Sequence, residues 1–435
     1  MTSTTDTALP TPAPTLDVAR IRADFPILGE QVNGRPLIYL DSAATSQKPQ
    51  QVLQAEYDFL THANAAVHRG AHTLAADATD LFEDARTTVA GFVGAPAEQL
   101  VWVSGATMGL NLLAYAFGNA TAGRGAPASA RFALKPGDEI VTTAIEHHAN
   151  LIPWQELAAR TGAVLRHIPA HADGTLDLDA AASTIGPRTR VVAFTHVSNV
   201  LGIINPVDQL IALAREVGAV TVMDACQSAP HLPLDLPALG VDFAVFSGHK
   251  MLGPYGVGGL YGRAEMLDAL PPFLTGGSMI TTVTLDTDEY LPAPQRFEAG
   301  TQPVGPAIGL AAAVRYLEDV GLDAIHAHEK ALAARMREGL ADIPGIRLLG
   351  DAEGSERVGL WAFDVEGVHA HDAGQFLDDR GIAVRVGHHC AAPLHRQYGV
   401  TASVRASAAL YNTADEIDAL VDAVRGIRAY FGVES

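Results

Sequence analysis

Residues 241–250 read VDFAVFSGHK and join a strand to a lysine. The run from Val241 to Phe246 alternates too little between polar and apolar residues for a strand with one wet face, so it predicts a strand buried on both faces. Lys250 then follows the carboxyl end of a sheet strand, the edge at which open α/β sheets bind ligands. An amine there is placed to form a Schiff base. The glycine-rich stretch 253–259 behind it predicts a turn that can pass close to a bound group.

Six further apolar runs of similar length are mostly separated by helical stretches. The seven expected strands lie near 101–104, 139–143, 164–168, 191–195, 219–223, 242–246 and 258–261. This order predicts an α/β fold with a mostly parallel seven-stranded sheet covered by helices on both faces. Residues 119–131, rich in Gly, Ala, Ser and Pro, predict a surface loop.

The last third of the chain predicts a smaller α+β domain. Strands are expected at 346–349, 359–363 and 382–386, and helices at 372–379 and 414–428, after a helix that begins within 309–317. We therefore expect a disordered Thr/Pro/Ala-rich tail at 1–16, a large domain at 17–310 and a small domain at 311–435.

Composition and charge narrow the class of protein. The 435 residues suffice for one large core and a smaller one, and two cysteines argue against a disulfide scaffold. The net charge of -20 disfavours nucleic acid and anionic membranes as partners. No apolar run approaches the roughly 18 residues of a membrane span, and residues 1–16 lack the basic start and apolar core of a signal peptide. We therefore expect a cytoplasmic enzyme.

Polar residues follow three other predicted strands. Asp224 could pair with a pyridinium nitrogen and keep it protonated, which makes a pyridoxal ring an electron sink. Gln227 could donate to the phenolic oxygen of that ring. Thr107 lies at a predicted helix N-terminus, where a phosphate is favoured. His147 could stack on the ring and shuttle a proton.

Each of these residues alone also fits a plain structural role. Asp224 could cap a helix, Gln227 could be a surface amide, Lys250 could be solvated, and the turn at Thr107 could be a simple N-cap. His147 could be a core histidine, but a metal pair with its neighbour is not expected, because adjacent histidines on an extended chain point apart. Their occurrence in one α/β pattern favours a cofactor site without metal.

A second reactive group is Cys390, which lies 140 residues after Lys250 in the run GHHCA. A cysteine flanked by histidines on a polar loop is placed to be a thiolate. Three histidines could activate it: His147, His388 and His389. The lysine and the cysteine together indicate cofactor-assisted sulfur chemistry.

Eight motifs, in this order along the chain, resemble those of SufS-type cysteine desulfurases, which are pyridoxal-phosphate-dependent enzymes of the class V aminotransferase family. The motifs are DSAA (41–44), AVHRG (66–70), EHHAN (146–150), THVSNVLG (195–202), SGHK (247–250), RFEAGT (296–301), RVGHHC (385–390) and RAS (405–407). The resemblance extends from about residue 21 to about residue 431. It implies the large and small domains of a fold type I aminotransferase.

The resemblance also implies a role for each site residue. Lys250 would hold pyridoxal 5'-phosphate, and Cys390 would take the sulfur of L-cysteine as a persulfide, releasing L-alanine and supplying iron–sulfur cluster assembly. His147 would stack on the ring, Asp224 would pair with the ring nitrogen, and Gln227 would bond the phenolic oxygen. The phosphate would be held by the turn Ala106-Thr107, by Ser247 and His249, and by Thr301 from the second subunit of a dimer. Asn199 and Arg405 would bind the substrate carboxylate.

Three positions depart from the pattern of many relatives. Ala106 replaces a hydroxyl residue, Met108 replaces a glutamate, and Cys226 replaces a small apolar residue and is expected to be buried and inert. Two other functions stay open. One is a selenocysteine or cysteine-sulfinate lyase on the same scaffold, which would use Lys250 without a need for Cys390. The other is a catalytically idle binding protein, which the intact reactive residues disfavour.

His371, in the run VHAHD (368–372), bears on the sulfur acceptor. By resemblance, desulfurases with a zinc-containing SufU-type acceptor have His-x-His-Asp here, whereas those with a SufE-type acceptor tend to have tyrosine. An imidazole near Cys390 could take a coordination site on the zinc of the partner and free a thiolate to receive sulfur. The alternative is that His369 and His371 begin a surface helix with Asp372 as its cap.

Overall fold

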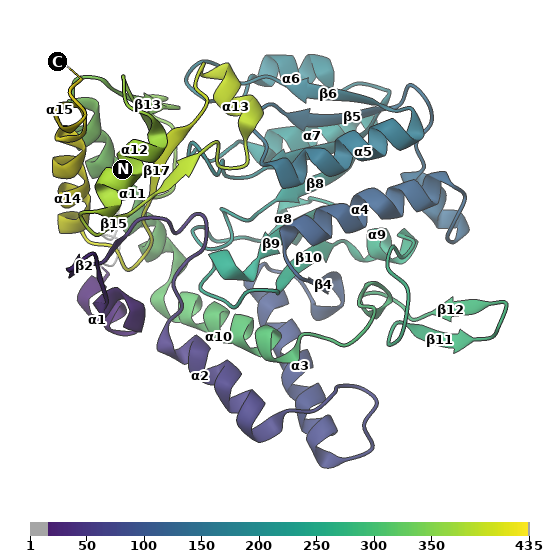
Figure 1. The fold of residues 1–435 in the computed structure, drawn as a ribbon. Helices are drawn as coiled ribbons and strands as arrows, with labels where there is room; N and C mark the ends of the chain where they lie inside the picture. Colours follow the sequence, from purple (N-terminus) through teal and green to yellow (C-terminus); the bar gives the residue numbers. More distant parts are fainter. Residues whose placement is uncertain (1–15, 434–435) are drawn as a thin grey trace, which may run out of the picture.

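Seven strands form the central sheet of the computed structural model, which describes residues 16–433 (Figure 1). In the order in which they lie side by side they are β4 (Leu100–Val103), β10 (Gly258–Gly262), β9 (Phe243–Ser247), β8 (Val220–Asp224), β7 (Thr189–Thr195), β5 (Glu139–Thr143) and β6 (Val164–Ile168). Strand β10 is antiparallel to both of its neighbours, and the other neighbouring pairs are parallel. The predicted mostly parallel sheet is confirmed. The predicted tail at 1–16 lies outside the described residues except for its last residue.

The sheet is buried on both faces because alternate side chains of each strand enter different cores. In β9, Ala244 and Phe246 join one core, whereas Phe243 and Val245 join the other. This arrangement explains why residues 241–246 lack polar alternation. The first face is covered by α3 (Thr73–Phe92), α7 (Val207–Val217) and α10 (Val304–Val320), and the second by α4 (Ala106–Thr121), α5 (Ile152–Thr161) and α9 (Ala264–Ala269).

Two parts of the chain extend from this body in Figure 1. Helix α2 (Gln50–Asp58) packs on α10 beside α3 and forms an arm below the sheet. A hairpin of β11 (Ile280–Val283) and β12 (Asp288–Tyr290) projects to one side. Among the described residues, no helix combines the length and apolarity that a membrane crossing needs.

A smaller antiparallel sheet lies beside the large one, with strand order β13 (Ile346–Leu349), β14 (Leu360–Val365), β17 (Ser403–Ser407) and β16 (Arg385–Gly387). Helices α11 (Leu322–Ala341), α12 (Ala370–Asp378) and α14 (Ala414–Arg425) share a third core with it. The N-terminal segment reaches this part, because β3 (Ile38–Tyr39) pairs in parallel with β15 (Ile382–Ala383). The shorter elements are α1 (Val18–Ala23), β1 (Gln31–Val32), β2 (Arg35–Pro36), α6 (Leu178–Thr184), α8 (Leu236–Leu239), α13 (Ala392–Gln397) and α15 (Ile427–Tyr430).

Two predictions of local structure need correction. The single strand expected at 382–386 is two strands, because β15 pairs with β3 whereas β16 pairs with β17. The surface loop expected at 119–131 is largely ordered: its first three residues end α4, and Ser129, in a short helical turn, is buried with its hydroxyl 2.7 Å from the Ala269 carbonyl oxygen. Helix α10 runs unbroken through residue 310, so the expected domain boundary falls inside a helix, and the division into domains stays a prediction.

Candidate active site

A cavity of about 210 Å³ opens where β8 and β9 end. Its wall includes ten of the thirteen predicted site residues: Lys250, Asp224, Gln227, His147, Thr107, Ala106, Ser247, His249, Asn199 and Arg405. Cys390, Thr301 and His371 are not part of this wall. The structure adds Ala43 and Ala44 from the N-terminal segment and Arg385 from β16.

The N-terminal segment fastens the turn that carries the lysine. Gly248–Lys250 forms one 3-10 turn directly after β9. Within it, the His249 carbonyl oxygen accepts hydrogen bonds from the Ser46 amide (3.0 Å), the Thr45 hydroxyl (3.0 Å) and Lys48 Nζ (3.2 Å). With the Ser46 hydroxyl (3.2 Å) as a fourth donor, the backbone before the lysine is held by three residues from a segment about 200 residues away.

The N-terminus of α4 leaves room for an anion at one end of the cavity. Gly105 is the N-cap of this helix and has no side chain that could bond the helix amides. The Ala106 amide donates to Ser247 Oγ (2.9 Å), which joins the ends of β4 and β9, and Thr107 is exposed. Nearby, His249 Nδ1 is buried without a hydrogen-bond partner among the described residues. Because helix N-termini with free N–H groups bind phosphate, this end of the cavity fits a phosphate group.

Three side chains meet the requirements of a pyridine ring. Asp224 is buried, and its Oδ1 accepts a hydrogen bond from the Cys226 amide (2.9 Å). Gln227 Nε2 donates to the Ala43 carbonyl oxygen (2.8 Å), which leaves its second N–H for another acceptor. His147 Nδ1 accepts from the Ala149 amide (3.0 Å), so the proton of the neutral ring is on Nε2. Burial, and then the charge of Lys250, lowers the pKa of His147 to about 4, so the imidazole is neutral at pH 7.

The predicted carboxylate-binding pair is also brought together. Arg405 is 1% exposed and donates to the Asn199 carbonyl oxygen (2.8 Å) and to Asp41 Oδ1 (3.2 Å). Its Nε is buried without a partner among the described residues, which leaves a donor for an incoming carboxylate. Burial, followed by other charges that include Arg385, lowers the pKa of Arg405 to about 10. The Asn199 side chain has another contact: its Nδ2 donates to the His389 carbonyl oxygen (2.7 Å).

The Cys390 loop lies against the cavity wall. His389 and Cys390 both have left-handed backbone conformations, with φ of 49° and 58°. The His148 amide donates to the Cys390 carbonyl oxygen (2.6 Å), and His148 Nε2 accepts from the Ala392 amide (3.1 Å). Cys390 is also close enough to Arg405 that a charge on its thiol raises the pKa of the guanidinium. The thiol is therefore a neighbour of the cavity although it does not line it.

The structure distinguishes the histidines around this thiol. His389 is buried, with Nε2 2.9 Å from Ser403 Oγ, and burial lowers its pKa far below the usual range. His388 is exposed, and its Nδ1 accepts from the Cys390 amide (3.2 Å). The other cysteine, Cys226, is buried as predicted, and burial raises the pKa of its thiol to about 12.

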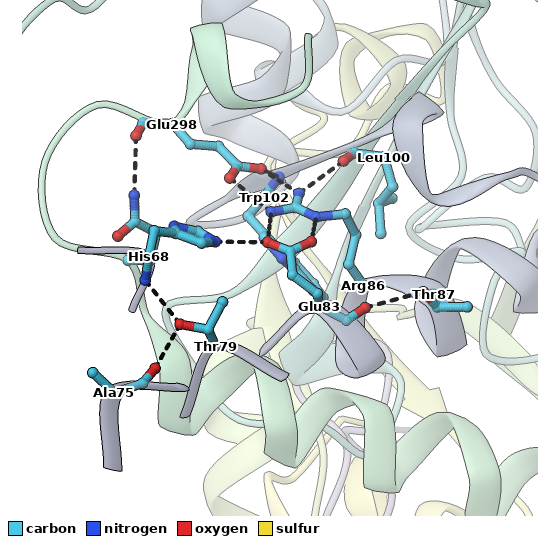
Figure 2. Close-up of polar contacts among 10 residues, drawn as sticks. His68, Ala75, Thr79, Glu83, Arg86, Thr87, Leu100, Trp102 and Glu298 are labelled. Atoms are coloured by element: carbon cyan, nitrogen blue, oxygen red, sulfur yellow. Dashed lines mark hydrogen bonds and ion pairs between the residues drawn. The ribbon is translucent and has the colours of Figure 1, made fainter. Parts of the chain in front are cut away.

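Thr301 lies on a loop outside this cavity and lines a second one of about 260 Å³. The loop begins at Glu298, whose buried carboxylate accepts two hydrogen bonds from Arg86 (2.5 and 2.9 Å) and one from the Trp102 amide (2.8 Å) (Figure 2). Figure 2 shows that Glu83 extends this network from Arg86 to His68. Thr301 is thus anchored through its loop to α3 and β4, and within one chain it does not reach the predicted phosphate end.

His371 is exposed in the first turn of α12, and its ring stacks on that of His369 (5.6 Å, 11°). His369, not Asp372, caps this helix, because His369 Nδ1 accepts from the His371 amide (3.3 Å). Helix α12 packs on β16, the strand that leads into the Cys390 loop.

Comparison with known proteins agrees with this geometry. A model of the aminotransferase class-V family matches residues 38–420. The chain belongs to this family. Among its members, the probable cysteine desulfurase 2 of Mycobacterium leprae is 55% identical over 424 residues, covering 96% of this chain and 98% of the relative. The cysteine desulfurase of Klebsiella pneumoniae is 49% identical over 420 residues, covering 96% of this chain and 100% of the relative.

Solved structures of class V aminotransferase family members share the fold. The apo cysteine desulfurase of Thermococcus onnurineus superimposes with a TM-score of 0.88 at 38% identity, covering 95% of this chain and 98% of that one. The cysteine desulfurase CsdA of Escherichia coli, in its S-sulfonic acid form, gives a TM-score of 0.84 at 38% identity, covering 96% and 100%.

Sequence reasoning missed residues that act through distant contacts. Asp41, which lies in a recognised motif, had no assigned role, yet it pairs with Arg405 from 364 residues away. Glu146 precedes the predicted ring-stacking histidine and is 2% exposed. A signal for Glu146 was present, because an acidic residue three positions after a predicted buried strand must find donors if it is buried too.

Proposed function

We propose that this class V aminotransferase family member is a pyridoxal-phosphate-dependent cysteine desulfurase of the SufS type. It converts L-cysteine to L-alanine and leaves the sulfur as a persulfide on Cys390. One observation carries the proposal: His148 and Asn199 bond the loop of Cys390 to the wall of the cavity that Lys250 and Asp224 line. The names of the two relatives, which are 55% and 49% identical over 96% of this chain, support it.

Pyridoxal phosphate, when bound, supplies an electron sink conjugated to the substrate Cα. Lys250 would hold this cofactor covalently, and its Nζ would be the base that takes the Cα proton of the substrate. Asp224 accepts the N–H of the protonated ring, and Gln227 donates its second N–H to the phenolic oxygen. His147 covers the ring face as a neutral imidazole. Thr107, at the uncapped end of α4, donates to the phosphate together with the helix amides.

Arg405 selects the substrate through its carboxylate. The guanidinium already donates to Asp41 and Asn199 through its two terminal nitrogens, and its buried Nε has no partner among the described residues, so a donor is free for the substrate carboxylate. A buried N–H without an acceptor costs free energy, so a substrate carboxylate that accepts from Arg405 Nε binds more tightly for it. A thiol without a carboxylate would not gain this affinity.

Sulfur transfer uses the Cys390 thiolate. Its sulfur attacks the sulfur of the substrate, and an S–S bond forms while the C–S bond breaks. The electron pair of the broken bond stays with the carbon, which takes a proton and leaves as alanine. Burial lowers the pKa of His389 far below its usual range, which disfavours it as a base, so His147 and His388 are the candidates to accept the thiol proton.

The protein acts as a homodimer, in which Thr301 contributes to the phosphate site of the partner. The support is that Thr301 is exposed on an anchored loop yet absent from the cavity of its own chain. A fully active monomer at assay concentration, measured by light scattering after size exclusion, would contradict this.

The persulfide sulfur passes to a zinc-containing SufU-type acceptor for iron–sulfur cluster assembly in the cytoplasm. The acceptor type is supported by His371, which is exposed on α12, the helix that packs against the strand leading to Cys390. The cytoplasm is supported by the two cysteines of the described residues, which are both free thiols. His371→Ala should form the persulfide at the normal single-turnover rate and lose stimulation by a SufU-type acceptor. His369→Ala, which removes the neighbouring imidazole and keeps that of His371, is the control. Stimulation of the wild type by a SufE-type acceptor alone, or undiminished stimulation of His371→Ala by a SufU-type acceptor, would reject the assignment.

The main test measures alanine and persulfide from L-cysteine, and alanine from L-selenocysteine, in wild type, Cys390→Ala and Cys226→Ala. We expect Cys390→Ala to lose both products from cysteine and Cys226→Ala to retain them. Full alanine production by Cys390→Ala from both substrates would instead assign a selenocysteine lyase. A protein without a visible absorption band after incubation with pyridoxal phosphate would exclude both functions.

A further inference from the structure

Glu146 is a buried carboxyl that has no cationic partner at hydrogen-bond distance within residues 16–433. Its side chain instead faces three neutral donors from three places in the fold. Thr143 Oγ1, at the end of β5, is 2.6 Å from Oε1, and the Thr195 amide, at the end of β7, is 2.9 Å from the same oxygen. Asn150 Nδ2, in the turn before α5, donates to Oε2 at 2.7 Å. One side chain thus joins the ends of two strands to the start of a helix.

The direction of these hydrogen bonds is fixed by Trp154. The indole Nε1–H can only donate, and it lies 3.0 Å from Asn150 Oδ1. The Asn150 amide must therefore turn its oxygen to Trp154 and its Nδ2 to Glu146. Oε2 of Glu146 must then be an acceptor, a requirement that the amide of a glutamine cannot meet without placing two donors face to face.

The segments that Glu146 joins carry the groups proposed to hold the face and the nitrogen of the ring. Thr195 is the β7 partner of Asp224 in the sheet register, and the next amide, that of His196, donates to the Asp224 carbonyl oxygen (3.0 Å). On the other side, His147 directly follows Glu146. The carboxyl group of Glu146 therefore connects the segment that carries His147 to the strand that pairs with Asp224.

The network tolerates either charge state of Glu146. Burial, together with the charge of Asp224, raises the pKa of Glu146 to about 8, whereas the three donors act against this increase. A proton on Oε1 can be donated to the Thr143 hydroxyl, which accepts as well as donates. The two N–H donors keep their acceptors in both states, so the bridge persists on both sides of that pKa.

We propose that Glu146 is a positioning residue that holds His147 and Asp224 in register through its hydrogen bonds to Asn150 and Thr195. It does not line the cavity, and its role is to keep the imidazole that covers the ring face and the carboxylate that meets the ring nitrogen in one fixed relative position. The inference rests on the proposed function only in taking that ring to be the cofactor.

The test uses Glu146→Gln and the double variant Glu146→Gln/Asn150→Asp. In the single variant the NH2 group of the introduced amide faces either Asn150 Nδ2 or the Thr195 amide, so two donors oppose each other in either orientation. In the double variant, the carboxylate introduced at position 150 can accept from both the amide introduced at position 146 and Trp154, so every hydrogen bond is restored with the net charge of the wild type. Glu139→Gln, a change at the far end of the same strand, is the control, because Glu139 bonds Arg188 and does not line the cavity.

The first readout is 19F NMR of the apoprotein labelled with 5-fluorotryptophan, in which Trp361, bonded to Ala333 in the smaller sheet region, is an internal reference. The second is cofactor affinity, and the third is the alanine release rate. We expect Glu146→Gln to shift the Trp154 resonance and to weaken cofactor binding roughly tenfold or more, because one buried donor is left without an acceptor. The double variant should restore the resonance and most of the affinity and rate.

Two results would overturn the proposal. One is a Glu146→Gln variant with unchanged Trp154 resonance and cofactor affinity. The other is a double variant that regains the wild-type resonance but not the affinity, because the charge at residue 146, and not its hydrogen bonds, would then be what matters. If resonance and affinity behave as expected while wild type releases no alanine, Glu146 keeps its role and the desulfurase function fails.

Discussion

Removal of the Arg86 guanidinium should destabilise the fold far more than removal of a surface arginine with the same geometry. In Arg86→Met, the Glu298 carboxylate loses hydrogen bonds of 2.5 and 2.9 Å and keeps only the Trp102 amide. The Leu100 carbonyl oxygen loses its 3.0 Å donor as well. Because Arg86 and Glu298 have side-chain exposures of 2% and 4%, water cannot replace the lost partner. Breaking a buried ion pair of this kind costs about 3–5 kcal/mol.

The magnitude should depend on pH in a defined direction. Burial already raises the pKa of Glu298 above its usual range, and loss of Arg86 raises it further. A carboxyl whose pKa is higher in the folded than in the unfolded state loses stability as pH rises through the folded value. The destabilisation should therefore be larger at pH 8 than at pH 5.5, where protonation of Glu298 removes the uncompensated charge.

Urea unfolding of the apoprotein, followed by circular dichroism at one protein concentration, measures this effect. Arg335→Met is the control, since Arg335 and Asp418 form two hydrogen bonds of 2.6 Å at exposures of 49% and 47%, and such solvent-exposed pairs contribute little to stability. A loss in Arg86→Met no larger than that of Arg335→Met, or one that grows as the pH falls, would refute the reasoning.

Two further predictions concern the pH profile and backbone packing. Burial is the main cause that lowers the pKa values of His147 and His196 to about 4. Each of these histidines therefore removes up to about 1.4 kcal/mol of stability per pH unit as the pH falls below about 6.5. Glu146, whose pKa is raised to about 8, instead removes stability as the pH rises toward that value. The free energy of unfolding should therefore peak near pH 6.5 in urea titrations, and a continued rise between pH 7 and 9 would contradict this. In Gly258→Ala, the new Cβ would lie 2.4 Å from a carbonyl oxygen of β9, so the melting temperature of the variant should fall by many degrees. Gly256→Ala meets no atom within 4 Å but has φ of +74°, so its cost should be about 1 kcal/mol, and equal melting temperatures for the two variants would disprove the steric account.

The sheet could be predicted from sequence because its signals are local. The apolar run at 241–246 and the turn residues after it specify a buried strand without knowledge of its neighbours, and β9 begins one residue later than expected. Strand ends also place Asp224, Lys250 and His147 at one edge, since parallel strands bring their carboxyl ends together. The segment 382–386 could not be predicted in detail, because its division into β15 and β16 depends on pairing with β3 and β17.

The site was predictable residue by residue but not in its connections. Arg405 and Asn199 follow from the motifs, whereas the contact of Asn199 Nδ2 with the Cys390 loop depends on a packing between segments 190 residues apart. The same holds for the bridge made by Glu146, whose three donors come from separate elements. A single sequence carries hydropathy and turn chemistry, but it does not contain the orientation of one packed element relative to another.

The attachment of the N-terminal segment to the small sheet has a consequence during protein synthesis. Asp41 and Arg405 are 364 residues apart, and at about 5–20 residues per second the ribosome needs about 20–70 s to make the chain between them. Until then the segment that fastens the Lys250 turn lacks its partners in β15 and β17. A nascent chain therefore cannot complete the cavity, and one that stops early leaves Asp41 without its guanidinium partner. Reactive sulfur would be generated only by chains that have been finished and released.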